Sequence, residues 1–345
     1  MAGPDNIKIG NELRTAFRQW AETAKPAAAL RPVRLPAPRQ SSEPSGHART
    51  EFFRDGAAIH IHMSEAAVCG NMQTDAAAFE GWALALHLWL KCPLIVLHWA
   101  RPERKEGKLD RHYARFLYRA QRFAELFPWF QIGSPDHLSD CWVRAGKPLF
   151  LNVAGQEEKE SDNLKVEAVM ERGLVRQHRG VLMEALRLDA VDRQFPVGLY
   201  ETEDLKGPVF TGGTSAIDIV GIDDDRFTLI ELKACENIKV GAISELLFYA
   251  AMIRDAANGR FRFGGRQGGA SRMKDVNHDH ARKAQRIRAV LMAPRFHPLL
   301  DHPDLFPALN AATSKQSGLL PLSFEQWRID WAAPHDAPPK FEQVA

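Results

Sequence analysis

The chain has 345 residues, of which 45% are hydrophobic and 26% are charged, and its formal net charge is +2. The length predicts about two domains, and the hydrophobic fraction is typical of a globular protein, which excludes general disorder. A net charge so close to zero gives no global sign of nucleic-acid binding, so only the local distribution of charge can indicate it.

The N-terminal part of the chain predicts one helix and a linker. Residues 1–24 predict a short amphipathic helix with Leu13, Phe17 and Trp20 along one stripe. Residues 25–50 are rich in Pro, Ala and Ser. This composition predicts a flexible linker, because proline lacks an amide donor and the stretch has little surface to bury.

Several features favour a cytoplasmic protein without a membrane partner. The N-terminal sequence MAGPDNIKIG has no basic stretch followed by an apolar one, so no signal peptide is predicted. None of the four cysteines forms a C-x-x-C pair, which argues against a zinc ribbon and suits a reducing compartment. The most apolar segment, residues 82–99, is interrupted by His87, Lys91 and Pro93. It therefore predicts a helix followed by a buried strand rather than a membrane span.

The next part of the chain predicts a small α/β domain of unassigned role. Apolar runs predict strands at 57–63, 94–98 and 148–153. Periodic stretches predict helices at 75–91 and 109–126. Such alternation is typical of α/β domains. The polar run at 155–163 is the predicted boundary with the following domain.

From residue 164 onward the pattern predicts a second unit. Helices are predicted at 164–188, 241–257, 279–286 and 303–313. Extended segments are predicted at 194–200, 215–222, 226–234, 287–292 and 319–329. The strands at 215–222 and 226–234 are joined by an acidic turn, which predicts a β-hairpin.

That hairpin, SAIDIVGIDDDRFTLIELKACEN, contains the charged residues that suggest chemistry. Glu231 and Lys233 share a face of their strand, and the hairpin can bring Asp218 beside them. Two converging carboxylates repel each other unless a cation lies between them, and oxygen ligands favour Mg²⁺ or Mn²⁺. With an ammonium nearby, the set suits hydrolysis of a phosphodiester. The alternative is a surface hairpin with a solvated ion pair, which the apolar run FTLIELKA disfavours because burying charge is costly.

These residues resemble the motif of the PD-(D/E)XK nuclease superfamily. The motif here consists of Ile217-Asp218 and then Glu231-Leu232-Lys233, with isoleucine in place of the proline. The resemblance implies a restriction-endonuclease-like mixed β-sheet flanked by helices, in the order helix, strand, hairpin, helix, over residues of roughly 164–330. It also implies that Asp218 and Glu231 bind metal, that the Leu232 carbonyl adds a ligand, and that Lys233 acts on the attacking water.

The resemblance extends to positions on two predicted helices. Glu245 and Tyr249 lie four residues apart and therefore on one helix face, where RecB-like members have Gln-x-x-x-Tyr. Here glutamate replaces the glutamine. Some members place a metal-directed glutamate on the first core helix, for which Glu171 and Glu184 are candidates. Glu171 is preferred because two apolar residues follow it on a helical stripe.

A basic, Gly-rich stretch follows the hairpin and its helix. Residues 254–295 contain eleven Lys and Arg residues against three Asp. Arginine contacts phosphate through its planar fork, and exposed aromatics can stack on unpaired bases. The predicted nucleic-acid contacts are Arg260, Arg262, Arg266, Arg272 and Lys274, together with two phenylalanines in the same loop. The alternative is a solvated loop without a binding role.

Two other patterns have less specific interpretations. His60 and His62 share a face of a predicted strand, with His98 on another strand as a conceivable third metal ligand. No fourth ligand stands at a recognisable spacing, so core or interface histidines are the preferred interpretation. In the helix at 109–126, four arginines form a basic stripe, Arg111, Arg115, Arg119 and Arg122. It suits either a phosphate backbone or a solvated helix face.

The sequence therefore predicts an α/β protein with an N-terminal segment (1–50), a small α/β domain (51–160) and a PD-(D/E)XK nuclease-like domain (161–345). The leading function is a Mg²⁺- or Mn²⁺-dependent endo- or exodeoxyribonuclease for repair, restriction or phage defence, with RNA left open as a substrate. The alternative is a non-catalytic nucleic-acid- or partner-binding protein that retains the nuclease fold. A protein partner for the 51–160 domain and a homo-oligomer remain open.

Overall fold

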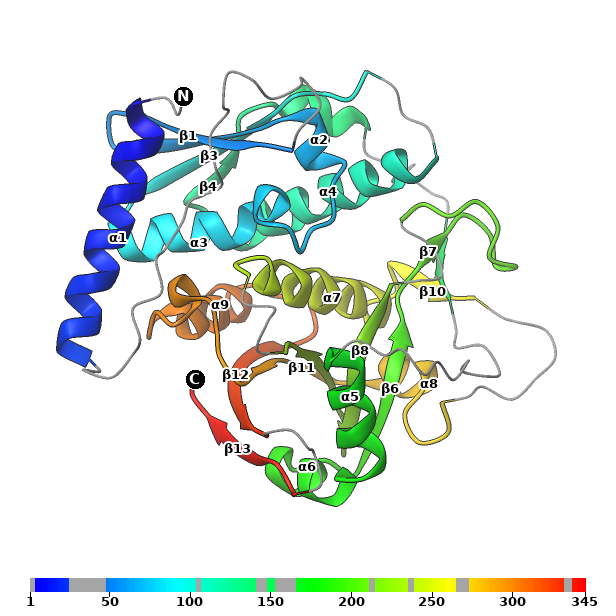
Figure 1. Ribbon diagram of the computed structural model, residues 1–345. Helices are drawn as coiled ribbons and strands as arrows, with labels where there is room; N and C mark the ends of the chain where they lie inside the picture. Colours follow the sequence, from blue (N-terminus) through cyan, green and yellow to red (C-terminus); the bar gives the residue numbers. More distant parts are fainter. Residues whose placement is uncertain are drawn as a thin grey trace. The chain divides into compact units, whose positions relative to one another are not determined.

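The computed structural model describes most of the chain. The described residues are 4–24, 48–103, 107–140, 148–152, 166–210, 215–234, 239–264, 273–331 and 337–345. The predicted α/β class is confirmed, because strands and helices alternate through both of its compact units (Figure 1). Unit 1 comprises Met1–Trp142, Lys239–Ser244 and Phe296–Leu305, and unit 2 comprises Val143–Ile238, Glu245–Arg295 and Phe306–Ala345. Most of the predicted linker, at 25–47, and the polar run at 155–163 lie outside the described residues.

Unit 1 is built on a four-stranded sheet in the order β1-β2-β3-β4. Its strands are β1 (Thr50–Asp55), β2 (Ala58–Met63), β3 (Leu94–Trp99) and β4 (Phe130–Ile132). β1 and β2 are antiparallel, and the other two pairs are parallel. The helical elements of unit 1 after the N-terminal helix are α2 (Glu65–Val68), η1 (Asp75–Ala77), α3 (Phe79–Leu90), α4 (Gly107–Leu126), η2 (Pro135–Asp140) and η3 (Pro298–Leu300). The predicted strands at 57–63 and 94–98 and helices at 75–91 and 109–126 are confirmed.

The first helix, α1 (Pro4–Ala24), packs against unit 1. Every fourth residue from Ile9 to Ala21 is buried, which gives the helix one apolar stripe. At its N-terminal end, Asn6 Oδ1 accepts a hydrogen bond from the Phe52 N–H at 3.0 Å. This contact satisfies a backbone donor of the edge strand β1, which would otherwise be open to another strand. The helix therefore belongs to unit 1, whereas the sequence placed it in a separate flexible segment.

A buried ion pair lies in the core of unit 1. Arg119 of α4 donates to both carboxylate oxygens of Glu80 of α3, at 2.7 and 2.5 Å, and Ser244 donates to the same carboxylate at 2.8 Å. Arg115 is buried as well. The predicted basic stripe is therefore wrong at Arg115 and Arg119, because both side chains are buried and not exposed. Arg119 points into the core because it pairs with Glu80.

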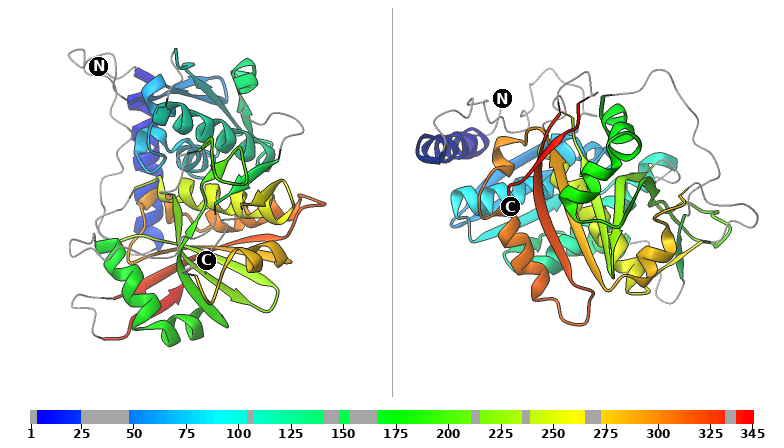
Figure 2. Two further views of the ribbon diagram at one scale, coloured as in Figure 1. Left: turned by 90° about the vertical axis from the view of Figure 1, so that its right-hand side faces the viewer. Right: turned by 90° about the horizontal axis from the view of Figure 1, so that it is seen from below.

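Unit 2 contains a six-stranded mixed sheet in the order β13-β12-β11-β9-β8-β6 (Figure 2). The strands are β6 (Ala190–Pro196), β8 (Ala216–Asp223), β9 (Arg226–Leu232), β11 (Arg286–Ala293), β12 (Leu322–Asp330) and β13 (Lys340–Gln343). β6, β8 and β9 form antiparallel pairs, β11 is parallel to both β9 and β12, and β13 is antiparallel to β12. The helices are α5 (Val166–Arg176), α6 (Arg179–Leu186), α7 (Ala242–Ala257), α8 (His278–Lys283) and α9 (Leu305–Ser314).

A small second sheet of unit 2 joins three short strands in the order β10-β5-β7. They are β10 (Phe261–Phe263), β5 (Leu149–Leu151) and β7 (Leu199–Tyr200). β5 corresponds to the predicted strand at 148–153, but it pairs within unit 2 and not with the strands of the preceding domain. The pairing partners lie 48 to 112 residues away in sequence, so local pattern alone could not place this strand.

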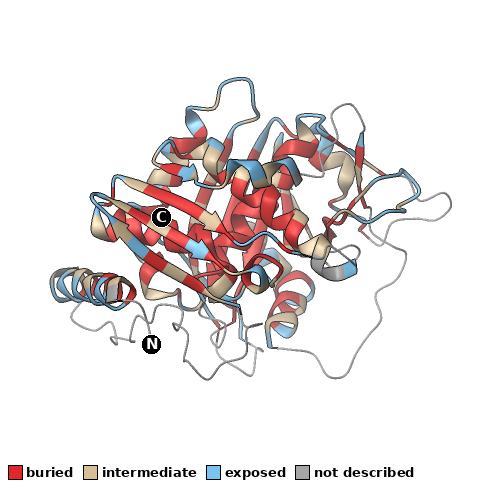
Figure 3. Ribbon diagram, turned by 90° about the horizontal axis from the view of Figure 1, so that it is seen from above, coloured by how far each residue is buried: buried red, intermediate tan, exposed pale blue. Residues whose placement is uncertain are grey.

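The core of unit 2 forms where α5 and α6 cover one face of the large sheet. Buried side chains of the helices, such as Leu174 and Leu182, pack with Ile219, Ile230 and Leu232 of the central hairpin. Figure 3 shows the buried residues along the strands and inner helices, and the exposed residues on loops and on the outer side of α1. None of the helices in the described part of the chain has both the length and the apolar character needed to cross a membrane.

Candidate active site

The β8–β9 hairpin brings the predicted acidic residues to one place. β8 and β9 pair from Asp223↔Arg226 to Ile219↔Ile230, and one step further along this register Asp218 lies opposite Glu231. There the backbone ladder ends, and Asp218 Oδ2 accepts the Leu232 N–H at 2.9 Å. Because Ile219, Ile230 and Leu232 face the helical core, the alternating residues Asp218 and Glu231 project from the other face of the strands.

Lys233 is the centre of a group of carboxylates. Its ammonium donates to Glu231, lies 2.8 Å from Glu245 Oε2 on α7 and lies 3.4 Å from Glu167 Oε1 on α5. The side chains of Lys233, Glu231 and Glu245 are at least 95% buried. The ion pairs therefore lie in a medium of low dielectric constant, where they are strong and hold the ammonium in one position.

Glu171 of α5 is fixed by two neighbours on β6. Arg193 Nε donates to Glu171 Oε1 at 2.7 Å, and Gln194 Nε2 donates to Oε2 at 2.6 Å. Gln194 has φ of +57°, a left-handed conformation that is uncommon for a residue with a side chain. The β6–β8 ladder skips Gln194, between the pairs Arg193↔Ile219 and Phe195↔Ile217, at the level of Asp218. The strained residue is thus next to the carboxylate pair, where such conformations tend to accompany function.

Burial and mutual repulsion control the protonation of these groups. Burial raises the pKa of Asp218 to about 8; Lys233 opposes this rise and Glu171 adds to it. Burial, and then the charges of Asp218 and Glu245, hold the pKa of Glu231 well above its usual value. For Lys233, burial alone would lower the pKa, but Glu231, Glu245 and Asp218 outweigh it and raise the pKa well above normal. Lys233 therefore stays charged, whereas Asp218 and Glu231 lose their protons less readily than ordinary carboxyl groups unless a cation joins the site.

The donor set fits a hard divalent cation. Glu231 is buried, and its Oε2 atom has no hydrogen-bond donor among the described residues while both carboxyl groups are ionised; only a protonated carboxyl lets Glu231 hydrogen-bond with Glu245, which helps to raise the pKa of Glu231. A buried acceptor without a donor is costly, and a cation between Glu231 and Asp218 would satisfy it. All the candidate ligands are oxygens, which Mg²⁺ and Mn²⁺ prefer. Asp218 and Glu231, with the Leu232 carbonyl, are the residues that would hold the ion. Glu171 is near enough for its charge to raise the pKa of Asp218, but both of its oxygens are bonded to β6.

Two further predicted residues lie at the same site. Glu245 contacts Lys233 as described, and Tyr249 is buried one helical turn further along α7. Burial, and then the carboxylates of Glu245 and Glu231, raise the pKa of Tyr249 well above its usual value, so the phenol keeps its proton. Glu184, the second candidate for the first-helix glutamate, is exposed on α6, whereas Glu171 is in the cluster.

Glu167, Arg193 and Gln194 are site residues that were not predicted from the sequence. Glu167 lies four residues before Glu171, so a shared helix face was visible in the sequence. Arg193 and Gln194 lie inside a strand with apolar ends, AVDRQFP, and such polar interruptions were the available signal. What the sequence did not contain was the pairing of β6 with β8, which positions both residues beside Asp218.

The predicted nucleic-acid-binding loop is only partly described. Arg260, Arg262 and Lys274 are exposed, while Arg266 and Arg272 lie outside the described residues. Phe261 is buried in β10, and its expected role as a base-stacking side chain is therefore wrong. It is drawn inward because β10 pairs with β5. Phe263 is half-buried and packs against the ring of His278 at 5.7 Å.

The site has to be interpreted from its own residues. Comparison of the chain with protein-family models, curated proteins and solved structures found no match. The geometry of Asp218, Glu231 and Lys233 is therefore the basis for any statement about function.

Proposed function

We propose that unit 2 is a Mg²⁺- or Mn²⁺-dependent nuclease that hydrolyses phosphodiester bonds, with DNA as the preferred substrate. The observation that carries the proposal is the meeting of Asp218 and Glu231 beside a charged, immobilised Lys233. A structural ion pair needs one carboxylate for one ammonium. Here Lys233 faces three carboxylates within 3.4 Å, an excess of negative charge that suits a divalent cation.

The order of elements supports the same proposal. Along the chain, the helices α5 and α6 precede strand β6, and after the short strand β7 come the hairpin β8–β9 and helix α7. β6, β8 and β9 belong to the six-stranded mixed sheet. The PD-(D/E)XK resemblance implies this order, with the motif on the hairpin and the supporting residues on the two helices. We therefore assign the six-stranded sheet and its helices to a restriction-endonuclease-like fold as part of the proposal.

Each residue has a role that follows from its environment. The ion, when bound, supplies Lewis-acid chemistry to the scissile phosphate and the attacking water. Asp218 and Glu231 would hold it, and Glu171, fixed by Arg193 and Gln194, would add negative charge beside this pair. Lys233 cannot act as a base, because its pKa is raised. It instead orients the water and offsets negative charge on the phosphate.

The exposed cations of unit 2 support a nucleic-acid substrate. Arg260, Arg262 and Lys274 belong to the same unit as the site and are open to solvent. Cations of this kind bind the phosphate backbone without reading sequence, and their contribution falls as salt rises. We expect binding to DNA to weaken steeply with ionic strength.

A cleavage assay with matched lysine variants tests the proposal. Chelator-treated full-length protein is incubated with circular duplex, linear duplex, single-stranded DNA and RNA, with Mg²⁺, Mn²⁺ or EDTA. We expect metal-dependent cleavage of DNA, and a loss of at least about 100-fold in Lys233→Met, since removal of one charge-stabilising donor costs that much. Lys340→Met, which removes an exposed lysine of the same sheet, should cleave like wild type.

The same assay separates the nuclease from a binding protein that retains the fold. A non-catalytic protein would bind DNA in a gel-shift experiment, without cleaving any of the four substrates under either metal. Equal activity of Lys233→Met and wild type would also contradict the proposal, because the cleavage would then come from another site or from a contaminant.

A further inference from the structure

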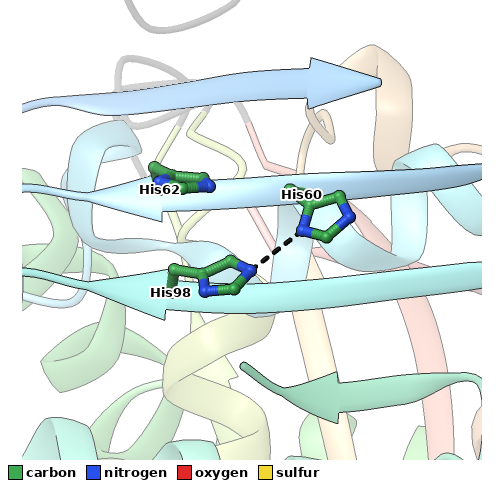
Figure 4. Close-up of side chains that lie close together, drawn as sticks. All are labelled: His60, His62 and His98. Atoms are coloured by element: carbon green, nitrogen blue, oxygen red, sulfur yellow. Dashed lines mark hydrogen bonds between the residues drawn. The ribbon is translucent and has the colours of Figure 1, made fainter. Parts of the chain in front are cut away.

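Three histidines gather on one face of the sheet in unit 1 (Figure 4). His60 and His62 are two residues apart on β2, and the β2–β3 register pairs His62 with His98. Side chains two residues apart share a strand face, and so do registered neighbours on adjacent strands. The alternating residues Ile59 and Ile61 are buried in the core. The histidines therefore lie on the more open face, where His62 is exposed and the other two are half-buried.

The spacing of the ring nitrogens suits a shared metal ion. His60 Nδ1 and His98 Nε2 are 2.9 Å apart, and one nitrogen from each of the three rings lies within 4.8 Å of the others. Nitrogens bound to one tetrahedral Zn²⁺ at about 2.0–2.1 Å are separated by roughly 3.3 Å. The nitrogen–nitrogen distances in the cluster range from 2.9 Å to at most 4.8 Å, so they lie on either side of the distance expected around Zn²⁺. Small rotations of the three side chains would therefore bring the nitrogens around one ion.

The neighbouring strands leave room for this arrangement. A Cβ atom on Gly133 would lie 2.1 Å from Cε1 of the His98 ring, so the absence of a side chain there lets the ring occupy its position. On the other side, the β1–β2 register pairs Glu51 with His62, which places a carboxylate on the same face. Glu51 is outside the group of ligand atoms that lie within 4.8 Å of one another, so a fourth ligand position would be filled by water.

We propose that His60, His62 and His98 form a three-histidine site for a divalent transition-metal ion, with Zn²⁺ as the expected occupant. Imidazole nitrogens favour Zn²⁺ over the hard Mg²⁺ ion that carboxylates prefer. The site is separate from the carboxylate cluster of unit 2 and does not depend on the proposed nuclease function. Sequence spacing favoured core or interface histidines, because the third ligand comes from a different strand 36 residues after His62.

Cobalt spectroscopy of the full-length protein tests this site. Co²⁺ is titrated into chelator-treated Asp218→Asn/Glu231→Gln protein, in which the carboxylate cluster has lost two of its proposed ligands. We expect one equivalent of Co²⁺ to give the intense visible absorption of a tetrahedral site, and Zn²⁺ to displace it. His62→Ala and His98→Ala in the same background should weaken Zn²⁺ binding by more than about 100-fold, beyond the effect of a second-shell change.

Two comparisons keep the result decisive. His112→Gln changes a half-buried histidine of α4 and should bind Co²⁺ like its parent. Because His62 is exposed, His62→Ala should keep the circular dichroism spectrum and unfolding midpoint of its parent. Absence of tetrahedral absorption in the parent would overturn the proposal, and so would unchanged Zn²⁺ affinity in His62→Ala.

Discussion

Replacing Asp218 by asparagine should stabilise the metal-free protein. Burial raises the pKa of Asp218 from 3.8 to about 8, so the folded state disfavours the ionised form that the unfolded chain adopts above about pH 4. The contribution of Asp218 to the free energy of unfolding is therefore fully present below about pH 4, and it is lost as the pH rises toward 8. At about pH 7.5 the linkage relation gives at most about 5 kcal/mol. Because Asp218 is only half-buried, solvent screening reduces this, and we expect about 1–2 kcal/mol.

Asparagine is a suitable probe because its side-chain oxygen can still accept the Leu232 N–H that Asp218 accepts. Urea unfolding at about pH 7.5 in EDTA should show a higher midpoint for Asp218→Asn than for wild type. Saturating Mn²⁺ should reverse the order, since a ligand at about 100 times its Kd adds about 2.7 kcal/mol to the wild type. Asp330→Asn, at an exposed position of β12, should follow wild type.

A lower midpoint for Asp218→Asn in EDTA would refute the reasoning, because the carboxylate would then stabilise the fold without a cation. An equal response of both proteins to Mn²⁺ would show that the ion binds elsewhere.

Three other outcomes follow from the structure. Glu171→Gln should lower cleavage about 10–100-fold at limiting Mg²⁺ and recover partly at high Mg²⁺, as expected for a residue that tunes a metal site; rates that do not depend on Mg²⁺ would contradict this. Arg119→Met should lower the free energy of unfolding by about 3–5 kcal/mol, because Glu80 is left buried without its partner, and a change below 1 kcal/mol in urea unfolding would be too small for a buried pair. Burial lowers the pKa of His297 to about 4, so this histidine should contribute a loss of about 2 kcal/mol between about pH 7.5 and pH 5, as the unfolded state takes up a proton that the folded state refuses. His297→Gln should lack this part of the loss, and an identical pH profile in urea unfolding would rule the explanation out.

Local sequence pattern was sufficient for the hairpin and its neighbours. The alternation around Asp218 and the run FTLIEL predicted β8 and β9, and the acidic turn predicted their connection. The i, i+2 relation of Glu231 and Lys233 and the i, i+4 relation of Glu245 and Tyr249 are geometric consequences of strand and helix. These positions could therefore be assigned before any tertiary contact was known.

Contacts between distant segments account for what the sequence did not predict. The supporting residues Arg193 and Gln194 depend on the pairing of β6 with β8, and the burial of Phe261 depends on the pairing of β10 with β5. The edge strands β1 and β13 were not predicted, since their exposed positions weaken the apolar pattern. Arg119 looked like a surface residue because its partner Glu80 lies 39 positions earlier in the chain.

Anomalous diffraction from crystals soaked in Mn²⁺ tests the central claim most directly. We predict a manganese peak bonded to the carboxylates of Asp218 and Glu231 and adjacent to the Lys233 ammonium. The peak should disappear in crystals of the Glu231→Gln variant. A manganese-free cluster in wild-type crystals, with ordered Mn²⁺ bound only elsewhere on the protein, would contradict the assignment of these residues as a metal-dependent active site.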